Sequence, residues 1–460
     1  MKLFPTRVLP VLLLALSAFG HPAADADPAW VKQVGAKTMP TARATFAAAN
    51  YGAVGDGKTL NTLALQKAID AAAQKGGVVT LAPGQYLTGS LFLKKGVELH
   101  LGKGVTILGS QDLKDYPDRI TRVAGIEMVW PAALLNILDQ DNVAITGEGT
   151  VDGQGKPFWD GYWALRKDYD KKGLRWIVDY DAKRPRLLVL ANSSNITVKG
   201  VTLQRSGFWT VHVLYSKHVT VDSITVRNNL GGHGPSTDGI DIDSSSYVLV
   251  QNSDIDCNDD NFCLKAGRDA DGLRVNRPAE YIVIQNCVAG AGGGLFTCGS
   301  ETSGGIRHVI ARNLKAKGTK VGIRIKSALN RGGTVEDIKV DNIEMDSVDT
   351  AILLTMNWNP TYSYSTLPEG YTEATLPAHW KAMLTKVDPE KGLPHFRNVV
   401  ISNVKVQNAK RAISAEGQPN SLLEGMTLEN VTMTAETAGG LNYAKDDEPI
   451  AVQNSSKIKV

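Results

Sequence analysis

A short pattern that recurs along the chain constrains the fold more than any other feature. It has nine positions: aromatic or polar, apolar, any, apolar, any, small or polar, apolar, any, apolar. The copies are NITVKGVTL, HVTVDSITV, YVLVQNSDI, YIVIQNCVA, HVIARNLKA, DIKVDNIEM, NVVISNVKV and GMTLENVTM, beginning at Asn195, His218, Tyr247, Tyr281, His308, Asp337, Asn398 and Gly425. Most copies begin roughly 20–35 residues after the one before, an interval typical of solenoids. The step from Asp337 to Asn398 is about twice as long and fits two coils or one coil with an insertion.

The alternation of apolar and other residues within each copy predicts short β-strands. The Asn or Gly in mid-pattern predicts a bend, because these residues tolerate left-handed backbone geometry. Short bent strands that recur at this interval predict the coils of a parallel β-helix, an all-β solenoid. Helical repeats would need the periodicity of an α-helix, which is absent. A β-sandwich or jelly roll would need hairpin turns and would not explain the recurring pattern.

One amphipathic helix precedes the repeats. Residues Thr62 to Lys75 have a helical apolar pattern, Thr59 or Asn61 is placed to cap the first turn, and Gly76-Gly77 ends it. A helix at this position would cover the core and the strand edges that the first coil otherwise exposes.

The organisation that we expect has three parts. Residues 1–26 form a signal peptide, 27–110 the N-terminal cap and first coils, and 111–460 the main β-helix. A segment near 357–395 is rich in aromatic residues and proline, which predicts a long ordered loop inserted between coils.

The first residues carry the features of an export signal. Lys2 and Arg7 precede an apolar run from Val8 to Ala18, and small residues place cleavage after Gly20 or after Ala26. The run is too short to cross a bilayer, which takes about 20 residues. An uncleaved anchor is the alternative. We therefore expect a secreted or periplasmic protein with no membrane association in its mature form.

Composition narrows the possible partners. The net charge is +3 and 21% of residues are charged, which does not suggest a nucleic-acid binder. The four cysteines, Cys257, Cys263, Cys287 and Cys298, lie close together in the chain and lack paired CxxC spacing. We expect them to be small buried residues of the coils, although one disulfide remains open.

Two acidic motifs fall on successive coils. STDGIDI begins at Ser236 and NDDNFCLKAG begins at Asn258, so the step from Asp238 to Asp259 is close to one coil. Coils stack about 4.8 Å apart, so Asp238 should lie above or below Asp259, with Asp260 beside them. Repulsion among three carboxylates should raise at least one pKa. A protonated acid beside an ionised base is what glycoside hydrolysis requires.

A basic motif follows on a later coil. Arg324 and Lys326 are separated by one residue, so in a strand both face one side, and Lys265 and Arg268 add positive charge to the second acidic coil. Cations beside catalytic acids favour an anionic sugar polymer over a neutral one. Two alternatives remain. In the first, the aspartates lie in turns and only bind backbone amides; Asp241 and Asp243 could be of this kind or could extend the cleft. In the second, the carboxylates form a calcium site.

With these motifs the chain resembles the polygalacturonase family of glycoside hydrolases, family 28, over nearly its whole mature length. The family's NTD motif matches Thr237-Asp238 with Ser236 in place of Asn, its GDD motif matches Asp259-Asp260 with Asn258 in place of Gly, and its RIK motif matches residues 324–326 unchanged. The resemblance implies a right-handed parallel β-helix that hydrolyses α-galacturonosyl bonds with inversion, without metal or cofactor. It implies that Asp259 is the general acid and that Asp238 and Asp260 activate water.

The chain departs from the family at one motif. The family's GHG, whose His supports the general acid, aligns with Gly292–Gly294, so Gly293 replaces the His. This resembles the rhamnogalacturonan-acting branch, because a smaller residue would leave room for a bulkier sugar. A literal GHG surrounds His233, which either reaches the cleft or lies in a surface loop. Other candidates for sugar contacts are Glu301, Trp209 and Trp358, each of which has a purely structural alternative.

Three functions are therefore weighed. The first is hydrolysis of a galacturonate-containing plant cell-wall polysaccharide or oligosaccharide. The second is a calcium-dependent pectic lyase, and the third a carbohydrate-binding β-helix without activity. The acidic pair favours hydrolysis, since a lyase needs no water-activating dyad. The segment 357–395 could close one end of the cleft and so favours exo action, and we expect a monomer.

Overall fold

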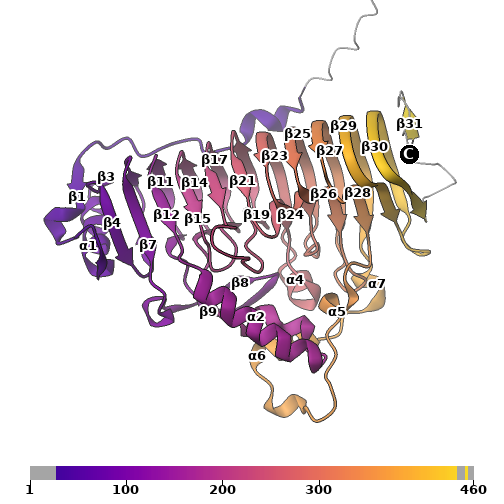
Figure 1. Ribbon diagram of the computed structural model, residues 1–460, viewed down its shortest axis with the longest axis horizontal. Coiled ribbons are helices and arrows are strands. Elements are labelled where there is room, and N and C mark those ends of the chain that lie inside the picture. The colour runs from indigo at the N-terminus through magenta and orange to yellow at the C-terminus, as the bar shows by residue number, and fades with distance from the viewer. Residues whose placement is uncertain (1–26, 443–450, 454–460) are drawn as a thin grey trace, which may run out of the picture.

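The computed structural model, which describes residues 27–442 and 451–453, is a parallel β-helix. Its coils stack along one long axis (Figure 1), and the pairings between coils are parallel. The predicted fold class is confirmed. Within the described residues no helix is long and apolar enough to cross a membrane.

Each coil contributes strands to three rows. Row 1 contains β5 (Leu91–Leu93), β10 (Leu135–Leu138), β13 (Leu188–Ala191), β16 (Val211–Leu214), β19 (Ile240–Asp243), β22 (Asp260–Lys265), β24 (Gly292–Cys298), β26 (Thr319–Lys326) and β28 (Thr350–Thr355). Row 2 contains β1 (Thr45–Ala47), β3 (Gly77–Thr80), β6 (Val97–Leu101), β11 (Asp141–Gly147), β14 (Ser194–Lys199), β17 (Lys217–Asp222) and β20 (Ser246–Gln251). Row 3 contains β2 (Asp56–Leu60), β4 (Gly84–Thr88), β7 (Val105–Gly109), β12 (Thr150–Asp152), β15 (Thr202–Gln204), β18 (Thr225–Arg227) and β21 (Asp254–Asp256).

In the later coils rows 2 and 3 merge into long bent strands. These are β23 (Ala279–Ala289), β25 (Ile306–Lys317), β27 (Thr334–Asp346), β29 (His395–Glu416) and β30 (Leu423–Asn442), followed by β31 (Ala451–Gln453). The second half of β29 also pairs with β28 and so completes row 1.

The recurring pattern corresponds to one strand of row 2, a bend, and one strand of row 3. In the first copy, β14 and β15 flank Gly200, whose φ is 79°. Ser223 and Asn252, at the same position of the next copies, have φ of 56° and 53°. The bend is confirmed, and it explains why Asn, Gly or Ser recurs there. The strands of row 1, which carry the acidic and basic motifs, lie outside the pattern.

The first position of each copy is also left-handed, and it forms an aromatic ladder. His218, Tyr247, Tyr281 and His308 have φ between 55° and 57° and stack in that order. Their ring centroids are 5.1, 4.8 and 4.9 Å apart. Each such contact is worth about 0.5–1.5 kcal/mol beyond burial. The ladder explains the aromatic residues at this position.

The core is a column of aliphatic side chains stacked coil on coil. Val198, Val221, Val250 and Ile284 lie opposite one another in register and are fully buried. Burying one such side chain contributes about 1.5–3 kcal/mol. Cys257, Cys263, Cys287 and Cys298 are free and buried, as the small apolar role predicts.

The N-terminal end of the stack is covered by α1 (Thr62–Ala73), which buries Leu65, Ala68, Ile69 and Ala72 against the first coil. The predicted capping helix is confirmed, although it ends slightly earlier than expected, at Ala73. Asn61 is its N-cap by position, but its side chain bonds Val54 instead of the first turn.

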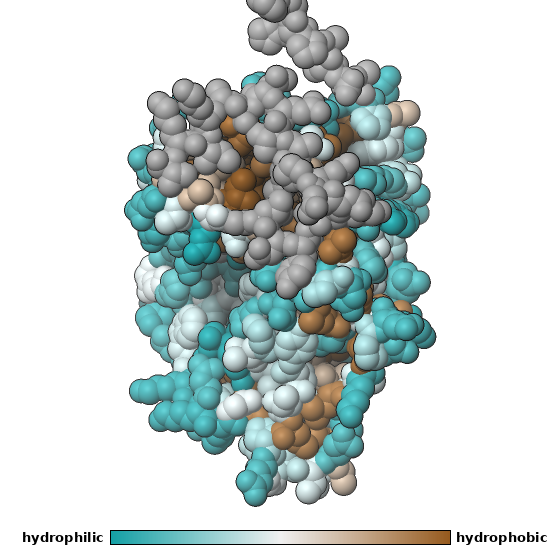
Figure 2. All heavy atoms as spheres, turned by 90° about the vertical axis from the view of Figure 1, so that its right-hand side faces the viewer, coloured by the Kyte–Doolittle hydropathy of each residue, from teal (hydrophilic) through white to brown (hydrophobic). Residues whose placement is uncertain are grey.

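Seen from the C-terminal end, hydrophobic residues of the stack are visible between hydrophilic sides (Figure 2).

Three large insertions between coils gather over row 1, and the short helix α4 (Asp269–Val275) lies beside them (Figure 1). The first is a hairpin of β8 (Asp118–Val123) and β9 (Ile126–Pro131). The second contains α2 (Lys156–Lys171), η4 (Arg175–Ile177) and α3 (Val178–Asp181). The third contains α5 (Pro360–Ser363), η5 (Glu373–Thr375), α6 (Ala378–Leu384) and α7 (Pro389–Gly392).

A second hydrophobic core joins the three insertions. Trp130, Trp176 and Trp380, one from each, are buried there with Phe208 of the coils. The ring centroids of Trp176 and Trp380 are 5.3 Å apart. This packing holds the insertions together as one wall above row 1.

Candidate active site

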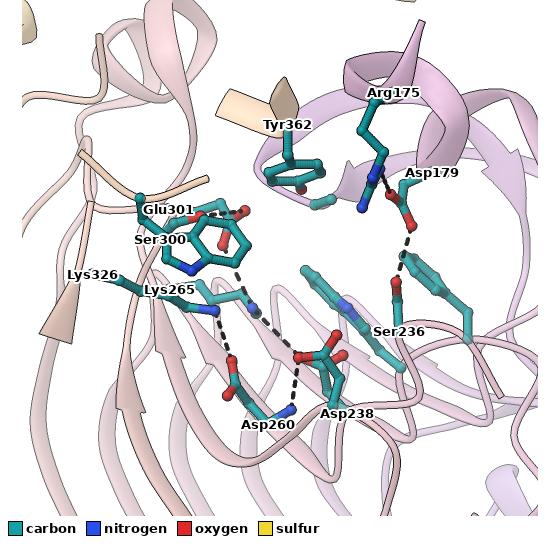
Figure 3. A pocket seen from close by; sticks show the side chains of 15 residues that line it. Arg175, Asp179, Ser236, Asp238, Asp260, Lys265, Ser300, Glu301, Lys326 and Tyr362 are labelled. Carbon is teal, nitrogen blue, oxygen red and sulfur yellow. Dashed lines mark hydrogen bonds and ion pairs between the residues drawn. The ribbon is translucent and has the colours of Figure 1, made fainter. Parts of the chain in front are cut away.

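Asp238, Asp259 and Asp260 line one pocket, with a volume of about 70 Å³ (Figure 3). Asp260 begins β22, and Asp238 lies just before β19, the neighbouring strand of row 1. The predicted convergence of the three acids is therefore present.

The register between the two coils differs by one position from the prediction. Ile240 lies opposite Phe262, and the Gly239 amide donates a 2.8 Å hydrogen bond to the Asp260 carbonyl. Asp238 is therefore aligned with Asp260, and its expected position over Asp259 was wrong. The ladder fixes the alignment, because a slip by one position would turn buried Ile240 and Ile242 outward. Asp238 and Asp260 are buried, whereas Asp259 is partly exposed to the pocket.

Two cations of the basic motif pair with a single carboxylate. Arg324 pairs with one oxygen of Asp260, and Lys326 Nζ lies 3.1 Å from the other. Arg324 and Lys326 both face the site, as their spacing in β26 predicted. Paired in this way, Asp260 has both of its oxygens opposite a positive charge, which favours its ionised form.

Lys265 is shared among three carboxylates. Its Nζ lies 3.6 Å from Asp238, 3.5 Å from Asp241 and 3.5 Å from Glu301. Burial alone would lower the pKa of Lys265, but the surrounding negative groups raise it well above the usual value. Lys265 therefore stays charged and holds the three acids close together.

Two buried acids of the site, Asp238 and Asp241, have raised pKa values. Burial, followed by the charges of Asp241 and Asp259, raises the pKa of Asp238 well above the ordinary value for aspartate. Asp241 is fully buried, and neither of its oxygens accepts a hydrogen bond from a described residue. Burial raises its pKa to about 7 despite the opposing charge of Lys265. Asp241 can therefore hold a proton near neutral pH, and the raised pKa of Asp238 agrees with the prediction for at least one of the three acids.

Asp243, the second aspartate left open by the sequence, has a structural environment. It is fully buried, its Oδ1 lies 2.8 Å from Arg122 Nη1, and its Oδ2 lies 3.4 Å from His212. Burial would raise its pKa, but Arg122 and His212 lower it below the usual range. Neither Asp241 nor Asp243 lines the pocket. Asp241 is connected to it through Lys265, which lies 3.5 Å away and lines the pocket, whereas Asp243 pairs with Arg122 and His212 outside it.

The donor set is poor for a cation. Asp238, Asp260 and Cys263 have ligand atoms within 4.8 Å of one another. Calcium prefers six to eight oxygen ligands, however, and both oxygens of Asp260 already face Arg324 or Lys326. The residues do not fit the calcium site that remained open from the sequence.

Two aromatic side chains in the pocket cover its lysines. Lys265 Nζ lies 4.7 Å from the centroid of Trp209, and Lys326 Nζ lies 4.2 Å from that of Trp358. Both tryptophans line the pocket, although Trp209 is buried. Glu301 also lines the pocket and is buried. The structure therefore brings Trp209, Trp358 and Glu301 to the site, each beside Lys265 or Lys326.

The opposite wall of the pocket comes from the insertions. Ala124 of the hairpin, Arg175 and Asp179 of the helical insertion, and Tyr362 of α5 line it. Arg175 Nη1 donates a 2.9 Å hydrogen bond to Asp179, which also accepts 2.9 Å from the Ser236 hydroxyl. Arg175 and Asp179 were not predicted, whereas Tyr362 belongs to the segment 357–395 that was expected to close one end of the cleft.

His233 is not brought to the pocket. It is exposed, its ring stacks on Trp163 at 6.0 Å, and its carbonyl accepts a hydrogen bond from the Trp163 indole. Of the two expectations for His233, substrate contact and surface loop, the structure agrees with the loop. The GHG sequence around His233 therefore does not correspond to the family's GHG motif.

Gly293, which replaces the family's histidine, lies against Asp259. Its amide donates a 2.7 Å hydrogen bond to the Asp259 carbonyl. A β-carbon built on Gly293 would lie 3.0 Å from the Asp259 carboxylate and 3.3 Å from Arg324 Nη2. A side chain at this position would contact both groups, which agrees with the alignment made from the sequence.

Comparison with known proteins identifies the family. The family described as "Glycosyl hydrolases family 28" matches residues 83–370, well over half of the chain. The chain belongs to this family. It is a glycoside hydrolase of the polygalacturonase type, and the resemblance predicted from the motifs is confirmed. A second family, described as "Rhamnogalacturonase A/epimerase, pectate lyase-like", matches only residues 46–111.

Individual relatives agree with this family 28 membership. A probable polygalacturonase from Vitis vinifera is 29% identical over 84% of this chain and 73% of its own length. An exo-poly-alpha-D-galacturonosidase from Dickeya chrysanthemi is 30% identical over 72% of this chain, which spans only 59% of that protein. The crystal structure of a hyperthermoactive exopolygalacturonase from Thermotoga maritima superimposes with a TM-score of 0.75 at 27% identity, covering 93% of this chain and 95% of that one. The right-handed β-helix of the pectin-lyase type is thereby confirmed.

The missed residues Arg175 and Asp179 had a detectable signal. Asn142 begins an earlier, weaker copy of the repeat, NVAITGEGT, and the step from Asn142 to Asn195 is more than twice the step from Asn195 to the next copy. The excess length marks an insertion directly before row 1. Neither residue lies in a recognised motif, so their position in the pocket could not be read from the sequence.

Proposed function

We propose that this family 28 enzyme is an exo-acting galacturonosidase, which releases terminal galacturonate from pectic chains by inverting hydrolysis. The observation that carries the proposal is the placement of the three acids. They lie at the floor of a pocket whose other wall is built by insertions from three separate places in the chain. A site walled on the side opposite the coils favours binding of a chain end over the middle of a polymer.

Asp259 is assigned as the general acid. It is the one of the three acids that is partly exposed to the pocket, so a glycosidic oxygen can reach it. The Asp260 amide donates a 3.0 Å hydrogen bond to Asp259 Oδ1, which fixes the side chain. In the reaction Asp259 gives its proton to the leaving oxygen as the glycosidic bond breaks.

Asp238 and Asp260 are assigned to the water. Carboxylate oxygens of the two lie within 4.8 Å of each other. One water molecule can bridge such a gap, since each hydrogen bond is about 2.7–2.8 Å long. Asp260, opposite Arg324 and Lys326, remains ionised and can take a proton from this water as it attacks the anomeric carbon. Attack from the face opposite the leaving group inverts the configuration.

Substrate choice within pectin follows the family. The match to the rhamnogalacturonase description covers residues 46–111, which contain none of the site residues, so it gives no support for a rhamnogalacturonan substrate. The relatives named polygalacturonase and exo-poly-alpha-D-galacturonosidase span the site. Galacturonan is therefore the substrate class that we assign.

The calcium-dependent lyase and the inactive binding module are less consistent with the site. A lyase would need a cation where Arg324 and Lys326 already lie. A binding module would have no reason to bury an acid such as Asp241 without hydrogen-bond partners among the described residues.

Export to the periplasm or the medium and a monomeric state complete the proposal. The signal peptide expected at residues 1–26 lies outside the described residues. N-terminal sequencing of the mature protein from the cell envelope or medium, with its mass in solution, would test both. Cleavage after Gly20 or Ala26 is expected.

The test of the activity is product analysis on defined oligogalacturonides. Release of monomeric galacturonate from the start of the reaction, first as the β-anomer by NMR, is expected, and chelator should have no effect. Early products of internal cleavage, such as dimer from a tetramer without monomer, would overturn exo action, and the α-anomer would overturn inversion. A product that absorbs ultraviolet light through a new double bond would identify a lyase.

A further inference from the structure

The cations at the floor of the pocket are committed to the protein's own acids. Arg324 and Lys326 both pair with Asp260, and Lys265 is shared among Asp238, Asp241 and Glu301. A substrate carboxylate would have to compete with these internal carboxylates for every one of them. The predicted role of these three cations in binding the uronate is therefore weakened by their own partners.

The opposite wall carries an excess of positive charge. Asp179 is paired with two guanidinium groups: Arg175 Nη1 lies 2.9 Å from one oxygen and Arg184 Nη2 lies 3.1 Å from the other. Burial would raise the pKa of Asp179, but Arg175 and Arg184 outweigh it and lower the pKa to about 2. Two cations and one anion leave a net charge of about +1 on this group of three side chains.

Of the two guanidinium groups, only that of Arg175 reaches the pocket. Arg184 is fully buried between aromatic rings, with its Cζ 4.2 Å from the centroid of Phe208. Arg175 is 17% exposed and lines the pocket. The excess charge is therefore presented to the substrate through Arg175.

The guanidinium of Arg175 is held in a fixed plane. Its Cζ lies 4.9 Å from the centroid of Tyr362, and its Nη1 is bonded to Asp179. Its Nε is buried and has no hydrogen-bond partner among the described residues. A buried donor left in this way costs free energy unless a ligand or water satisfies it. Figure 3 shows Arg175 and Tyr362 across the pocket from Asp238 and Asp260.

We propose that Arg175 binds the carboxylate of the galacturonosyl unit held in the pocket. A guanidinium can bind a carboxylate through paired hydrogen bonds, and Asp179 and Tyr362 position this one. The inference rests on the proposed function, because it names the group that recognises the acidic sugar in the same site. It goes beyond the motifs, since Arg175 belongs to an insertion outside the repeated coils.

A hydrogen bond connects this wall directly to the catalytic strand. The Ser236 hydroxyl donates to Asp179 Oδ1 at 2.9 Å, and only Thr237 separates Ser236 from Asp238. Ser236 is the residue at which the chain departs from the family's NTD motif. The short hydroxyl side chain of Ser236 thus links the wall that carries Arg175 and Asp179 to the strand that carries Asp238.

Arg175 also borders a second groove on the outer side of the wall. That groove is lined by Arg166, Asp170, Trp176 and Tyr364, and Arg166 does not line the pocket. Arg166 pairs with Asp170 at 3.3 Å and belongs to the same insertion. It therefore provides a matched control, an arginine of the wall that faces only the groove.

The test compares Arg175→Gln and Arg166→Gln with the wild type on trigalacturonate and on its methyl ester, which lacks the charge. We expect Arg175→Gln to raise KM for trigalacturonate about 10- to 100-fold with a much smaller change in kcat. It should also abolish the preference for the acid over the ester. Arg175→Lys, which keeps the charge without the paired geometry, should lie between. An unchanged KM and preference in Arg175→Gln, or the same loss in Arg166→Gln, would overturn the inference.

Binding of free galacturonic acid, measured by calorimetry, separates this inference from the proposed function. The wild type and Arg166→Gln should bind it, and Arg175→Gln at least about 10-fold more weakly. If the wild type shows no hydrolysis and the difference in binding is still observed, the proposed function is wrong and the role of Arg175 in binding the carboxylate is supported. Equal binding by wild type and Arg175→Gln would disprove the role of Arg175 in binding the carboxylate. Thermal unfolding of each variant shows that it is folded, and Arg175→Lys replaces Arg175→Gln if the latter is not.

Discussion

The stacked coils and the three insertions build opposite sides of one pocket by different means. On the coil side, neighbouring strands of row 1 place Asp238 beside Asp260 through the backbone ladder. On the insertion side, Arg175 and Tyr362 come from segments far apart in the sequence and meet because Trp176 and Trp380 pack together. One side is repetitive and local, and the other depends on a separate hydrophobic core.

This difference separates two tasks. In the proposed mechanism the coils supply the reacting acids, whose spacing is fixed to within a strand separation. In the proposed mode of recognition the insertions contact the substrate, and they can change without disturbing that spacing. A change on the coil side should therefore affect turnover, and one on the insertion side should affect binding or local stability.

The largest effect is expected from Asp259→Asn on the coil side. Removing the general acid should lower kcat by about 10²–10⁴-fold without changing the thermal unfolding, because Asp259 is partly exposed. The matched control is Asp254→Asn on the same coil, whose carboxylate pairs with Arg227 outside the pocket. Retained activity in Asp259→Asn would move the acid role to another member of the cluster.

Asp179→Asn tests the insertion side. It leaves fully buried Arg184 without its counter-ion, which should lower the free energy of unfolding by about 3–5 kcal/mol at pH 6. The pKa of Asp179 in the folded protein, about 2, lies below its ordinary value of 3.8. Its stabilisation is therefore complete above the ordinary value and is lost as the pH falls through about 2.

The difference between wild type and Asp179→Asn should accordingly narrow in acid, which denaturant titrations at several pH values would measure. Asp168→Asn, in an exposed pair with Lys172 of the same insertion, should cost less than about 1 kcal/mol. A similar cost for both variants would contradict the buried pairing.

Lys265→Met tests how the coil side sets the pKa of Asp238. Lys265 opposes the burial and the negative charges that raise this pKa. Its removal should raise the pKa of Asp238 further, so the acidic limb of kcat/KM, where Asp238 must be ionised to activate water, should move to higher pH. Lys265→Arg keeps the charge and should leave the limb in place. An unmoved limb in Lys265→Met would show that another group controls it.

The smallest effect is expected at the repeated bends of the coils. Asn313 has φ of 55° and bonds the asparagines of both neighbouring coils, Asn286 at 2.9 Å and Asn342 at 2.8 Å. Asn313→Ala should cost about 1–2 kcal/mol from backbone strain, and Asn313→Gly less, since glycine adopts this φ freely. Neither should change kcat. A larger loss for Gly than for Ala would show that the side-chain ladder outweighs the backbone.

Much of the fold and of the coil side could be predicted. The recurring pattern indicated the coils and their bends, the periodicity before it indicated the capping helix, and the two acidic motifs indicated the cluster. The error of one position over Asp238 and Asp259 arose because Asp259 and Asp260 are both about one coil away from Asp238. Only the ladder of Ile240 opposite Phe262 decides between them. Substrate contact by His233 was considered only because its neighbours match the family's GHG sequence, and such a local match does not determine where the residue lies in the fold.

The sequence by itself therefore determined the repeat, the family and the identity of the three acids, because each depends on residues close together in the chain or one coil apart. The tertiary structure decided which acid is exposed, which carboxylate takes the cations, and which arginine lines the pocket. These depend on contacts such as Arg175 with Tyr362, and on a pKa of Asp179 that is lowered only because Arg175 and Arg184 lie beside it and outweigh its burial. Packing between distant segments sets those distances, and no spacing in the sequence records them.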